Sequence, residues 1–309
     1  MRINRKTFLG ILVSSTSTFI LKSKRKVEAA WKSQAPEDPY GCLVDLTRCV
    51  GCRECEEACN NINKLPKPNF SFNDLKILDK KRRPDDKAFT IINRYYPGKM
   101  DKQDNPTPTF VKTQCMHCQD PACVSACIVG ALKKNKNGAV TWEEDKCIGC
   151  RYCLIACPFQ IPAYEYKNPL TPKVQKCNFC FNEISKEGGK PACANVCPME
   201  AITFGKRKKL VEIAENKLRK NPGRYINKIY GEKEVGGTCW MYISGESFEK
   251  LGFLNLPEKP MPEITESIQH GLFSYLWSPI ALFGVLAGVM RHFHLKKEKG
   301  KKTGEEESI

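Results

Sequence analysis

The segment Asp145–Phe159, DKCIGCRYCLIACPF, places four thiols close together in the chain. Its cysteines follow one another at spacings of three, three and four residues, and a proline follows the last: Cys147, Cys150, Cys153 and Cys157. Three thiolates at positions i, i+3 and i+6 can curl around one cube of iron and sulfide. Gly149 lets the backbone approach that cube, so that its N–H groups can hydrogen-bond the sulfur atoms. This spacing therefore predicts the ligands of a [4Fe–4S] cluster.

Sixteen of the 18 cysteines form four sets of this kind. The first and third sets have the C-x2-C-x2-C-x3-C spacing of bacterial ferredoxins. The second set reads C-x2-C-x4-C-x3-C, and the fourth has 12 residues between its second and third cysteines. In chain order the other three sets are Cys49, Cys52, Cys55 and Cys59; Cys115, Cys118, Cys123 and Cys127; and Cys177, Cys180, Cys193 and Cys197.

Two other uses of clustered cysteines fit this pattern less well. Zinc ribbons pair C-x2-C units, but a third cysteine at regular spacing is not typical of zinc sites. Disulfides do not repeat in fours at this spacing, and a chain of 309 residues is too long for a small disulfide-stapled scaffold. Pro158 and Pro198 follow the last cysteines of the third and fourth sets. Because proline fits the first turn of a helix, we expect a short helix to begin there and to turn the fourth cysteine toward a neighbouring cluster.

The formal net charge of +16 raises the question of a nucleic-acid partner. Much of the excess charge lies at the chain ends, since residues 1–32 carry eight Lys or Arg and one Glu. No strip of interleaved aromatic and basic residues of the RNA-binding kind is present in the sequence. We therefore expect the charge to serve membrane targeting and topology, with no nucleic-acid partner.

Residues 1–30 have the pattern of an export signal, with a basic start, an apolar run over Phe8–Leu21 and a second basic patch. The segment NRKTFLG resembles a twin-arginine signal, with Lys6 in place of the second arginine. That route suits a protein whose clusters are inserted before export. Val27 and Ala29 predict cleavage after Ala29, and the alternatives are an uncleaved anchor or a chance basic start.

Residues 268–291 are expected to form one transmembrane helix. No charged residue lies between Glu266 and Arg291, and the 20-residue run Gly271–Met290 is about 30 Å long as a helix, the thickness of a bilayer core. The basic tail, residues 292–309, predicts a cytoplasmic C-terminus by the positive-inside rule and places the preceding body on the outer side. A buried core helix is the alternative.

Four further segments have recognisable patterns. Ala88–Tyr96 alternates as a strand does, and Lys206–Pro222 has apolar residues at helical spacing and ends at a proline. Residues 234–243, EVGGTCWMYI, predict a turn followed by a strand. Residues 80–87, KKRRPDDK, predict a solvated loop.

From Tyr40 to Phe253 the chain resembles the four-cluster ferredoxin-like electron-transfer subunits of membrane-bound oxidoreductases. These include the beta subunits of formate dehydrogenases and the hydrogenase subunits of the HybA/HmcB type. The motifs that carry the resemblance are DLTRCVGCRECEEACN, CMHCQDPACVSAC, CIGCRYCLIACPFQIP, CNFC with PACANVCPMEAI, and YGEKEVGGTCWMYIS. The resemblance implies an α+β fold of two tandem or nested ferredoxin-like modules over residues 40–265, holding four [4Fe–4S] clusters.

The resemblance also implies that the cysteine sets exchange ligands in pairs, the first with the fourth and the second with the third. The four implied ligand groups are Cys49, Cys52, Cys55 and Cys197; Cys177, Cys180, Cys193 and Cys59; Cys115, Cys118, Cys123 and Cys157; and Cys147, Cys150, Cys153 and Cys127. Every set is complete, so no three-iron cluster is expected. Asn60 and Ile128 stand where the other two sets have proline, and neither change removes a ligand.

Cys42 and Cys239 lie outside the four sets. They are expected to be buried as small hydrophobic residues, and a disulfide between them is the alternative outside the cytoplasm. The four histidines are too dispersed for an independent metal centre: His117, His270, His292 and His294. His117 is expected to be structural or to tune a cluster, and His270 to be an interfacial residue rather than a haem ligand. Shielding of the clusters is expected from Ile148, Ile155, Phe159 and Ile161.

Because the chain holds no convincing catalytic constellation, we expect a non-catalytic electron-transfer subunit. The resemblance implies a relay between a periplasmic catalytic subunit, with hydrogenase favoured, and a quinone-reactive membrane subunit. The expected location is the inner membrane, with the cluster domain on the periplasmic side. The alternatives are the beta subunit of a formate dehydrogenase or another molybdopterin oxidoreductase and, from another class, an iron–sulfur sensor or assembly protein.

Overall fold

The computed structural model describes residues 35–166, 173–263, 266 and 282–294. The chain divides into two compact units, one formed by residues 32–264 and the other by residues 1–31 together with 265–309. The signal-like segment, residues 1–30, lies outside the described residues.

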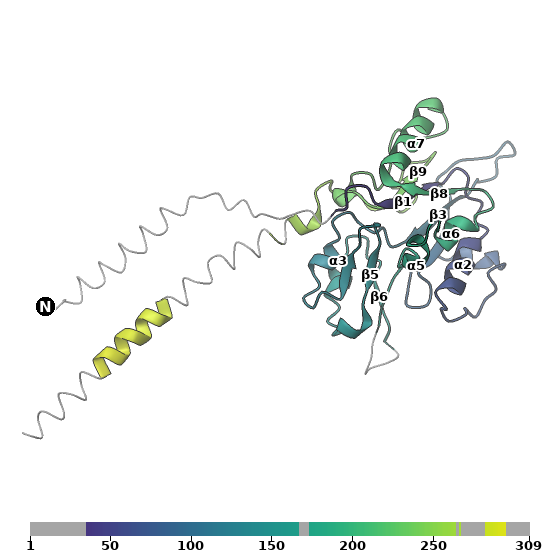
Figure 1. Ribbon diagram of the computed structural model, residues 1–309. Coiled ribbons are helices and arrows are strands. Elements are labelled where there is room, and N and C mark those ends of the chain that lie inside the picture. Colours follow the sequence, from purple (N-terminus) through teal and green to yellow (C-terminus); the bar gives the residue numbers. More distant parts are fainter. Residues whose placement is uncertain (1–34, 167–172, 264–265, 267–281, 295–309) are drawn as a thin grey trace, which may run out of the picture. The chain divides into compact units, whose positions relative to one another are not determined.

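The larger unit contains a three-stranded sheet, which lies toward the top of the unit in Figure 1. Its middle strand, β1 (Tyr40–Asp45), pairs antiparallel with β8 (Ile202–Lys206) and parallel with β9 (Trp240–Ile243). Because side chains alternate along a strand, the sheet has two different faces. One face carries Leu43 and belongs to the core beside helix α7 (Arg207–Lys220). The other carries Cys42, Val44, Trp240 and Tyr242 and belongs to the core that holds cysteines of the first and fourth sets.

Helix α7 (Arg207–Lys220) confirms the helix predicted over residues 206–222. Leu210, Ala214 and Leu218 recur at helical spacing and are buried against the sheet. Three basic residues in its last turn interact favourably with the negative end of the helix dipole and so stabilise the helix. The helix therefore covers the sheet face opposite the cysteines.

The rest of the unit consists of short elements. Three two-stranded antiparallel sheets pair β2 (Thr90–Tyr95) with β3 (Thr109–Gln114), β4 (Leu132–Lys134) with β5 (Val140–Trp142), and β6 (Ala163–Tyr164) with β7 (Val174–Gln175). The short helices are α2 (Glu54–Ile62), α3 (Ala122–Ser125), α4 (Tyr152–Ala156), α5 (Phe181–Ile184) and α6 (Ala192–Asn195). Single 3-10 turns are η1 (Leu75–Asp79), η2 (Glu144–Lys146) and η3 (Glu234–Gly236). This mixture of small sheets and helices agrees with the expected α+β class.

Helices from distant parts of the chain contact each other. Helix α2 packs against α6, and α3 packs against α4. Each of these helices carries a cysteine: Cys55 on α2, Cys193 on α6, Cys123 on α3 and Cys153 on α4. The first cysteine set therefore lies against the fourth, and the second against the third.

The strand predicted over Ala88–Tyr96 is confirmed as β2, and the turn and strand predicted over residues 234–243 are confirmed as η3 and β9. The solvated loop predicted over residues 80–87 has no regular structure, but the prediction is wrong for Arg82. Its guanidinium reaches Glu56 at 2.5 Å, and its side chain is 16% exposed.

Glu56 ties this loop to helix α2 and strand β2. Its side chain is 3% exposed and accepts hydrogen bonds from Arg53 at 3.0 Å and from the Ile92 N–H at 2.6 Å, besides the contact with Arg82. Arg53 is fully buried and also donates to three backbone carbonyls. A buried carboxylate with two guanidinium partners is well compensated, whereas either charge alone would not be.

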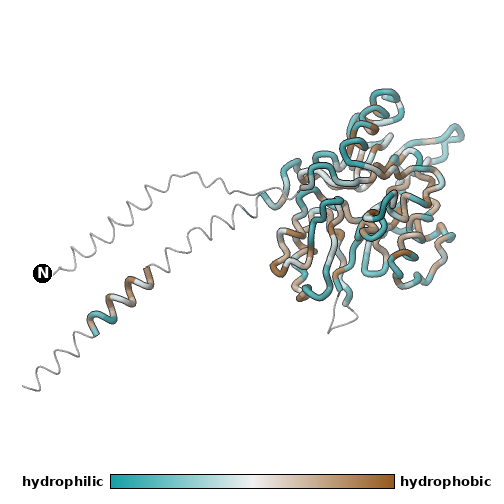
Figure 2. The backbone as a smooth tube through the Cα atoms, in the orientation of Figure 1, coloured by the Kyte–Doolittle hydropathy of each residue, from teal (hydrophilic) through white to brown (hydrophobic). Residues whose placement is uncertain are grey.

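In the smaller unit, residues 282–294 form a helix. It is hydrophobic over most of its length and hydrophilic at its end (Figure 2). The predicted membrane span, residues 268–291, lies mostly outside the described residues, and so does the tail beyond residue 294. Among the helices that the structure describes, none is both long and apolar enough to cross a membrane.

We expect Glu56→Ala to lower the apparent melting temperature of the cluster-loaded chain by about 10 °C, because it leaves the buried Arg53 guanidinium unpaired. The matched control is Glu212→Ala, which removes an exposed ion pair with Lys209 on helix α7. That control should change the melting temperature by no more than about 2 °C. Equal melting temperatures for the two variants in thermal scans would contradict the assigned role of Glu56.

Candidate iron–sulfur sites

All four cysteine sets share one backbone feature. The second residue after the first cysteine has a left-handed conformation in each: Gly51 at φ 72°, His117 at 49°, Gly149 at 69° and Phe179 at 62°. In the first and third sets the residue before the helix is also left-handed, at Arg53 and Arg151. The repeated reversal curls each cysteine loop.

Glycine is required at position 51 for two reasons, the positive φ and the absence of a side chain. A Cβ atom at this position would lie 2.4 Å from Cδ1 of Phe110. Phe110 is on strand β3, so the loop of the first cysteine set packs tightly against a strand some sixty residues away in the sequence. Any larger residue would push the loop away from that strand.

His117 and Phe179 occupy the equivalent left-handed position without being glycine, which sequence reasoning missed. A left-handed conformation costs an L-residue about 1–2 kcal/mol. Both side chains are buried, and their rings stack with centroids 4.9 Å apart. The aromatic stack offsets the strain and joins the second cysteine set to the fourth. Aligning the four motifs on their first cysteine would have revealed the shared position.

The last cysteines of the third and fourth sets do not begin helices, so that prediction is wrong. Each begins a tight turn, in which the N–H of Gln160 donates to the Cys157 carbonyl at 3.0 Å and the N–H of Glu200 donates to that of Cys197 at 3.1 Å. Gln160 and Glu200 have positive φ values, which end the turn before a helix can propagate. The N–H of Ala201 then donates to the Cys197 sulfur at 3.3 Å.

One cavity collects thiols from two different sets. Cys49, Cys52 and Cys55 of the first set line it together with Cys197 of the fourth. Helix α2 supplies Cys55, and the turn after α6 supplies Cys197. The contact of α2 with α6 therefore creates a four-thiol pocket that neither set could form alone.

The remaining cysteines are grouped in the same mixed way by which thiols lie close enough to raise one another's pKa. Cys59 interacts with Cys177, Cys180 and Cys193; Cys118 with Cys115, Cys123 and Cys157; and Cys153 with Cys127, Cys147 and Cys150. We define four thiol groups, which are A (Cys49, Cys52, Cys55, Cys197), B (Cys59, Cys177, Cys180, Cys193), C (Cys115, Cys118, Cys123, Cys157) and D (Cys127, Cys147, Cys150, Cys153).

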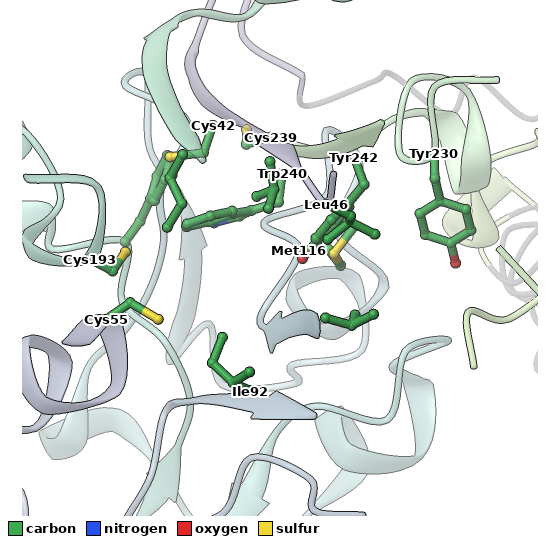
Figure 3. Packing of buried hydrophobic residues seen from close by; sticks show 14 of the residues in the cluster. Cys42, Leu46, Cys55, Ile92, Met116, Cys193, Tyr230, Cys239, Trp240 and Tyr242 are labelled. Atoms are coloured by element: carbon green, nitrogen blue, oxygen red, sulfur yellow. The ribbon is translucent and has the colours of Figure 1, made fainter. Parts of the chain in front are cut away.

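The four groups follow one another in a row. Cys55 of group A interacts with Cys193 of group B, and the two side chains lie near each other in Figure 3. Cys177 of group B interacts with Cys115 of group C. Cys123 of group C interacts with Cys153 of group D. Groups A and D are the ends of the row, and Cys150 of group D is exposed.

Burial suppresses ionisation of these thiols. It raises the pKa of Cys49 to about 11, that of Cys180 to about 11 and that of Cys177 to about 12. Only the thiolate binds a metal, so iron must displace these protons as it binds.

Three buried ring nitrogens near the thiols have no hydrogen-bond partner within the described part of the chain: Nε2 of His117, Nε1 of Trp142 and Nε1 of Trp240. The His117 Nδ1 atom accepts the Val140 N–H at 2.9 Å, so the proton lies on Nε2. Burial lowers the pKa of His117 well below its usual range, so the ring is neutral. Each ring can donate to cluster sulfur, which is the kind of contact that tunes such clusters. The donors and the grouped thiols both fit a [4Fe–4S] cofactor.

The two cysteines outside the sets are buried free thiols. The Cys239 sulfur lies 3.5 Å from Nζ of Lys134 and 3.5 Å from the carbonyl oxygen of Gly138. The expectation of burial is therefore confirmed for both Cys42 and Cys239. Among the described side chains, no three from His, Cys, Asp and Glu lie close enough to hold a single metal ion.

The predicted shielding residues divide into two kinds. Ile161 is buried and Phe159 half-buried, both in the core that contains Cys59, Cys115 and Cys177. The prediction is wrong for Ile148 and Ile155 within this chain, because they are 61% and 82% exposed. Ile148 lies in the cysteine loop of the third set, and Ile155 lies on the short helix α4 that follows it. His292 and His294 are exposed on the helix of the smaller unit, and His270 lies outside the described residues.

Comparison with known proteins agrees with this geometry. A family model described as a 4Fe-4S dicluster domain matches residues 107–207, which include the second, third and fourth cysteine sets. The hydrogenase-2 operon protein HybA of Escherichia coli O157:H7 is 33% identical, over 94% of this chain and 95% of its own. This chain belongs to the family of iron–sulfur electron-transfer subunits of oxidoreductase complexes.

Other members of the family differ in how much of the chain they match. The formate dehydrogenase-O iron–sulfur subunit of Escherichia coli K12 is 33% identical over 79% of this chain and 78% of its own. A protein of Nitratidesulfovibrio vulgaris strain Hildenborough is 43% identical over 99% of this chain and 80% of its own. The family thus includes subunits from both hydrogenase and formate dehydrogenase systems.

We expect Gly51→Ala to remove most of the iron held by group A, because the new methyl group meets Phe110 and displaces the cysteine loop. The measurement is iron per chain together with the electron paramagnetic resonance (EPR) signal of the reduced protein. Gly188→Ala is the matched control, since Gly188 has a similar φ of 66° but no atom within 4 Å of its Cβ position. Equal iron loss in both variants would show that backbone strain, and not the contact with Phe110, is responsible.

Proposed function

We propose that the chain holds four [4Fe–4S] clusters, one in each of the groups A, B, C and D. This assignment uses all sixteen cysteines of the four sets and leaves Cys42 and Cys239 as buried thiols. It also reproduces the exchange of ligands between sets that the family resemblance implies. The complete ligand sets support four-iron clusters throughout.

The observation that carries the function is the row A–B–C–D. Bound clusters of this type accept and release single electrons. Each neighbouring pair of groups is joined by interacting thiols: Cys55 with Cys193, Cys177 with Cys115, and Cys123 with Cys153. The row therefore supports electron transfer from one end of the domain to the other, with entry and exit at groups A and D.

The proposed partner at one end is a catalytic subunit, with a hydrogenase favoured. HybA matches nearly the whole of this chain, whereas the formate dehydrogenase-O subunit matches about four fifths of it. The second candidate is therefore the beta subunit of a formate dehydrogenase or another molybdopterin oxidoreductase. The proposed partner at the other end is a quinone-reactive membrane subunit.

We further propose that the chain is anchored in the inner membrane by one helix over residues 268–291. The uncharged run Gly271–Met290 and the basic residues after it support this topology, with the cluster domain on the periplasmic side and the C-terminus in the cytoplasm. The signal-like residues 1–30 support export of the domain.

A sensor or an assembly protein is the proposal from another class. Four complete cysteine sets argue against it, because sensing requires only one cluster. Deletion of the chain distinguishes an electron-transfer subunit from a sensor. Hydrogen- or formate-dependent quinone reduction should be lost if the chain is an electron-transfer subunit, whereas a sensor is not needed for the reaction itself.

The partner can be identified by extracting the native complex from membranes with mild detergent and isolating it on this chain. We expect nickel together with about sixteen irons per copy of this chain, plus the partner's own iron. Molybdenum or tungsten without nickel would favour the molybdopterin alternative. Recovery of the chain from the soluble fraction without detergent would contradict the membrane proposal.

The ligand exchange predicts a specific result for Cys127 and Cys153, which belong to different sets but to the same group D. Cys127→Ala and Cys153→Ala should each remove about four irons, and the double variant should remove no more than either alone. If each set held its own cluster, the double variant would lose about eight. Iron analysis and EPR spin counts distinguish the two.

The control for this experiment is Cys239→Ser. This buried thiol lies outside the four groups and already has polar neighbours that a hydroxyl group can use, namely Lys134 and Gly138. The Cys239→Ser variant should keep all of its iron, which would show that the loss of a buried cysteine does not by itself cause the loss of iron.

A further inference from the structure

Lys112 is a cation in the interior of the cluster domain. The residue is 2% exposed and lies on strand β3, two positions before Gln114 on the same face. Thr90 stands directly opposite Gln114 in the register of β2 and β3. The Lys112 Nζ atom donates to Thr90 Oγ1 at 2.7 Å and to Gln114 Oε1 at 2.8 Å. It also lies 4.3 Å from the centre of the Trp240 ring, a contact typical of a charged ammonium group.

The acceptors of Lys112 are held in place by the neighbouring sheet. Gln114 Nε2 donates to the Tyr242 hydroxyl at 2.6 Å, and that hydroxyl donates to the Lys112 carbonyl at 3.0 Å. This arrangement turns the Gln114 amide oxygen toward Nζ. Strands β3 and β9 therefore fix the position of the charge.

No carboxylate balances this charge within the described part of the chain. Two buried carboxylates, by contrast, have basic partners: Glu56 has Arg53 and Arg82, and Asp45 has Lys217. An isolated buried ammonium is costly unless an opposite charge lies close by. An anionic group other than a carboxylate would therefore stabilise the buried charge of Lys112.

The neighbours that remain are thiols of two groups. Lys112 lines the cavity of group A together with Cys49, Cys52, Cys55 and Cys197. It also interacts electrostatically with Cys193 and Cys177 of group B. The ammonium group therefore lies near the junction of A and B. No thiol of group C or D is among its main electrostatic partners.

We infer that Lys112 acts as a fixed positive charge that raises the reduction potentials of the clusters in groups A and B. The inference rests on the proposed function. A [4Fe–4S] cluster with four thiolate ligands is negatively charged, and reduction adds one more negative charge. A nearby cation stabilises the reduced form more than the oxidised form, and it does so most strongly in an interior that water does not screen. Lys112 thereby makes the clusters of groups A and B easier to reduce than they would be without this charge.

The test is an EPR-monitored redox titration of the full cluster-loaded chain carrying Lys112→Met. We expect two of the four potentials to become more negative, so that at a fixed potential the ratio of reduced to oxidised cluster falls on the order of tenfold. The other two potentials should not change. Repeating the titration in the Cys153→Ala background, which lacks the cluster of group D, identifies which of the unchanged signals belongs to that group.

Two controls separate charge from packing. Lys112→Arg keeps the charge and should hold all four potentials near their original values. Lys206→Met removes an exposed lysine whose Nζ also lies 4.3 Å from an aromatic ring, that of Tyr40, and should shift none of them.

The inference is wrong if Lys112→Met keeps its iron and all four potentials, or if all four potentials shift equally. If the Met variant loses iron, Lys112→Gln takes its place in the titration. Iron loss in the Met, Gln and Arg variants alike would assign Lys112 a packing role and overturn the inference. Iron loss from A and B in the two neutral variants only would support the charge. A wild-type chain without four clusters would instead contradict the proposed function.

Discussion

The contacts of α2 with α6 and of α3 with α4 are the interactions on which the candidate sites depend. A cysteine loop with this spacing offers three thiols to one site, and the fourth must come from elsewhere in the chain. The helix contacts supply it, because they bring Cys197 to the first loop and Cys127 to the third. The same contacts set neighbouring groups side by side, so ligand supply and the continuity of the row have a single structural cause.

The buried charged groups of this domain are of two kinds, those with a partner of opposite charge within the described part of the chain and those without one. Buried carboxylates such as Glu56 and Asp45 are matched by basic side chains. Around the thiols the balance is different, since Lys112 lacks a carboxylate partner among the described residues and burial raises the pKa of Cys177 to about 12. Protonated thiols and an uncompensated cation form an interior that becomes balanced when iron replaces the protons.

The backbone of the cysteine loops combines local and distant requirements. A left-handed residue is needed two positions after the first cysteine of every set, and glycine meets this need locally in two of them. In the other two, His117 and Phe179 adopt the same conformation because each supports the other through a buried ring stack. The strain in one loop is therefore relieved by the loop that follows about sixty residues later.

The sequence by itself determined the features that depend on neighbouring residues. Cysteine spacing gave the cluster chemistry, alternation gave strand β2, and helical periodicity gave α7, because each pattern reflects the geometry of a few consecutive residues. Its local rules failed where distant contacts decide: the turns after Cys157 and Cys197, the ion pair of Arg82 with Glu56, and the exposure of Ile148 and Ile155. The family resemblance already implied the mixed thiol groups, whereas only the tertiary structure decided their order and the burial of Lys112. These features arise from residues up to about 150 positions apart, and no local pattern encodes which of them will meet.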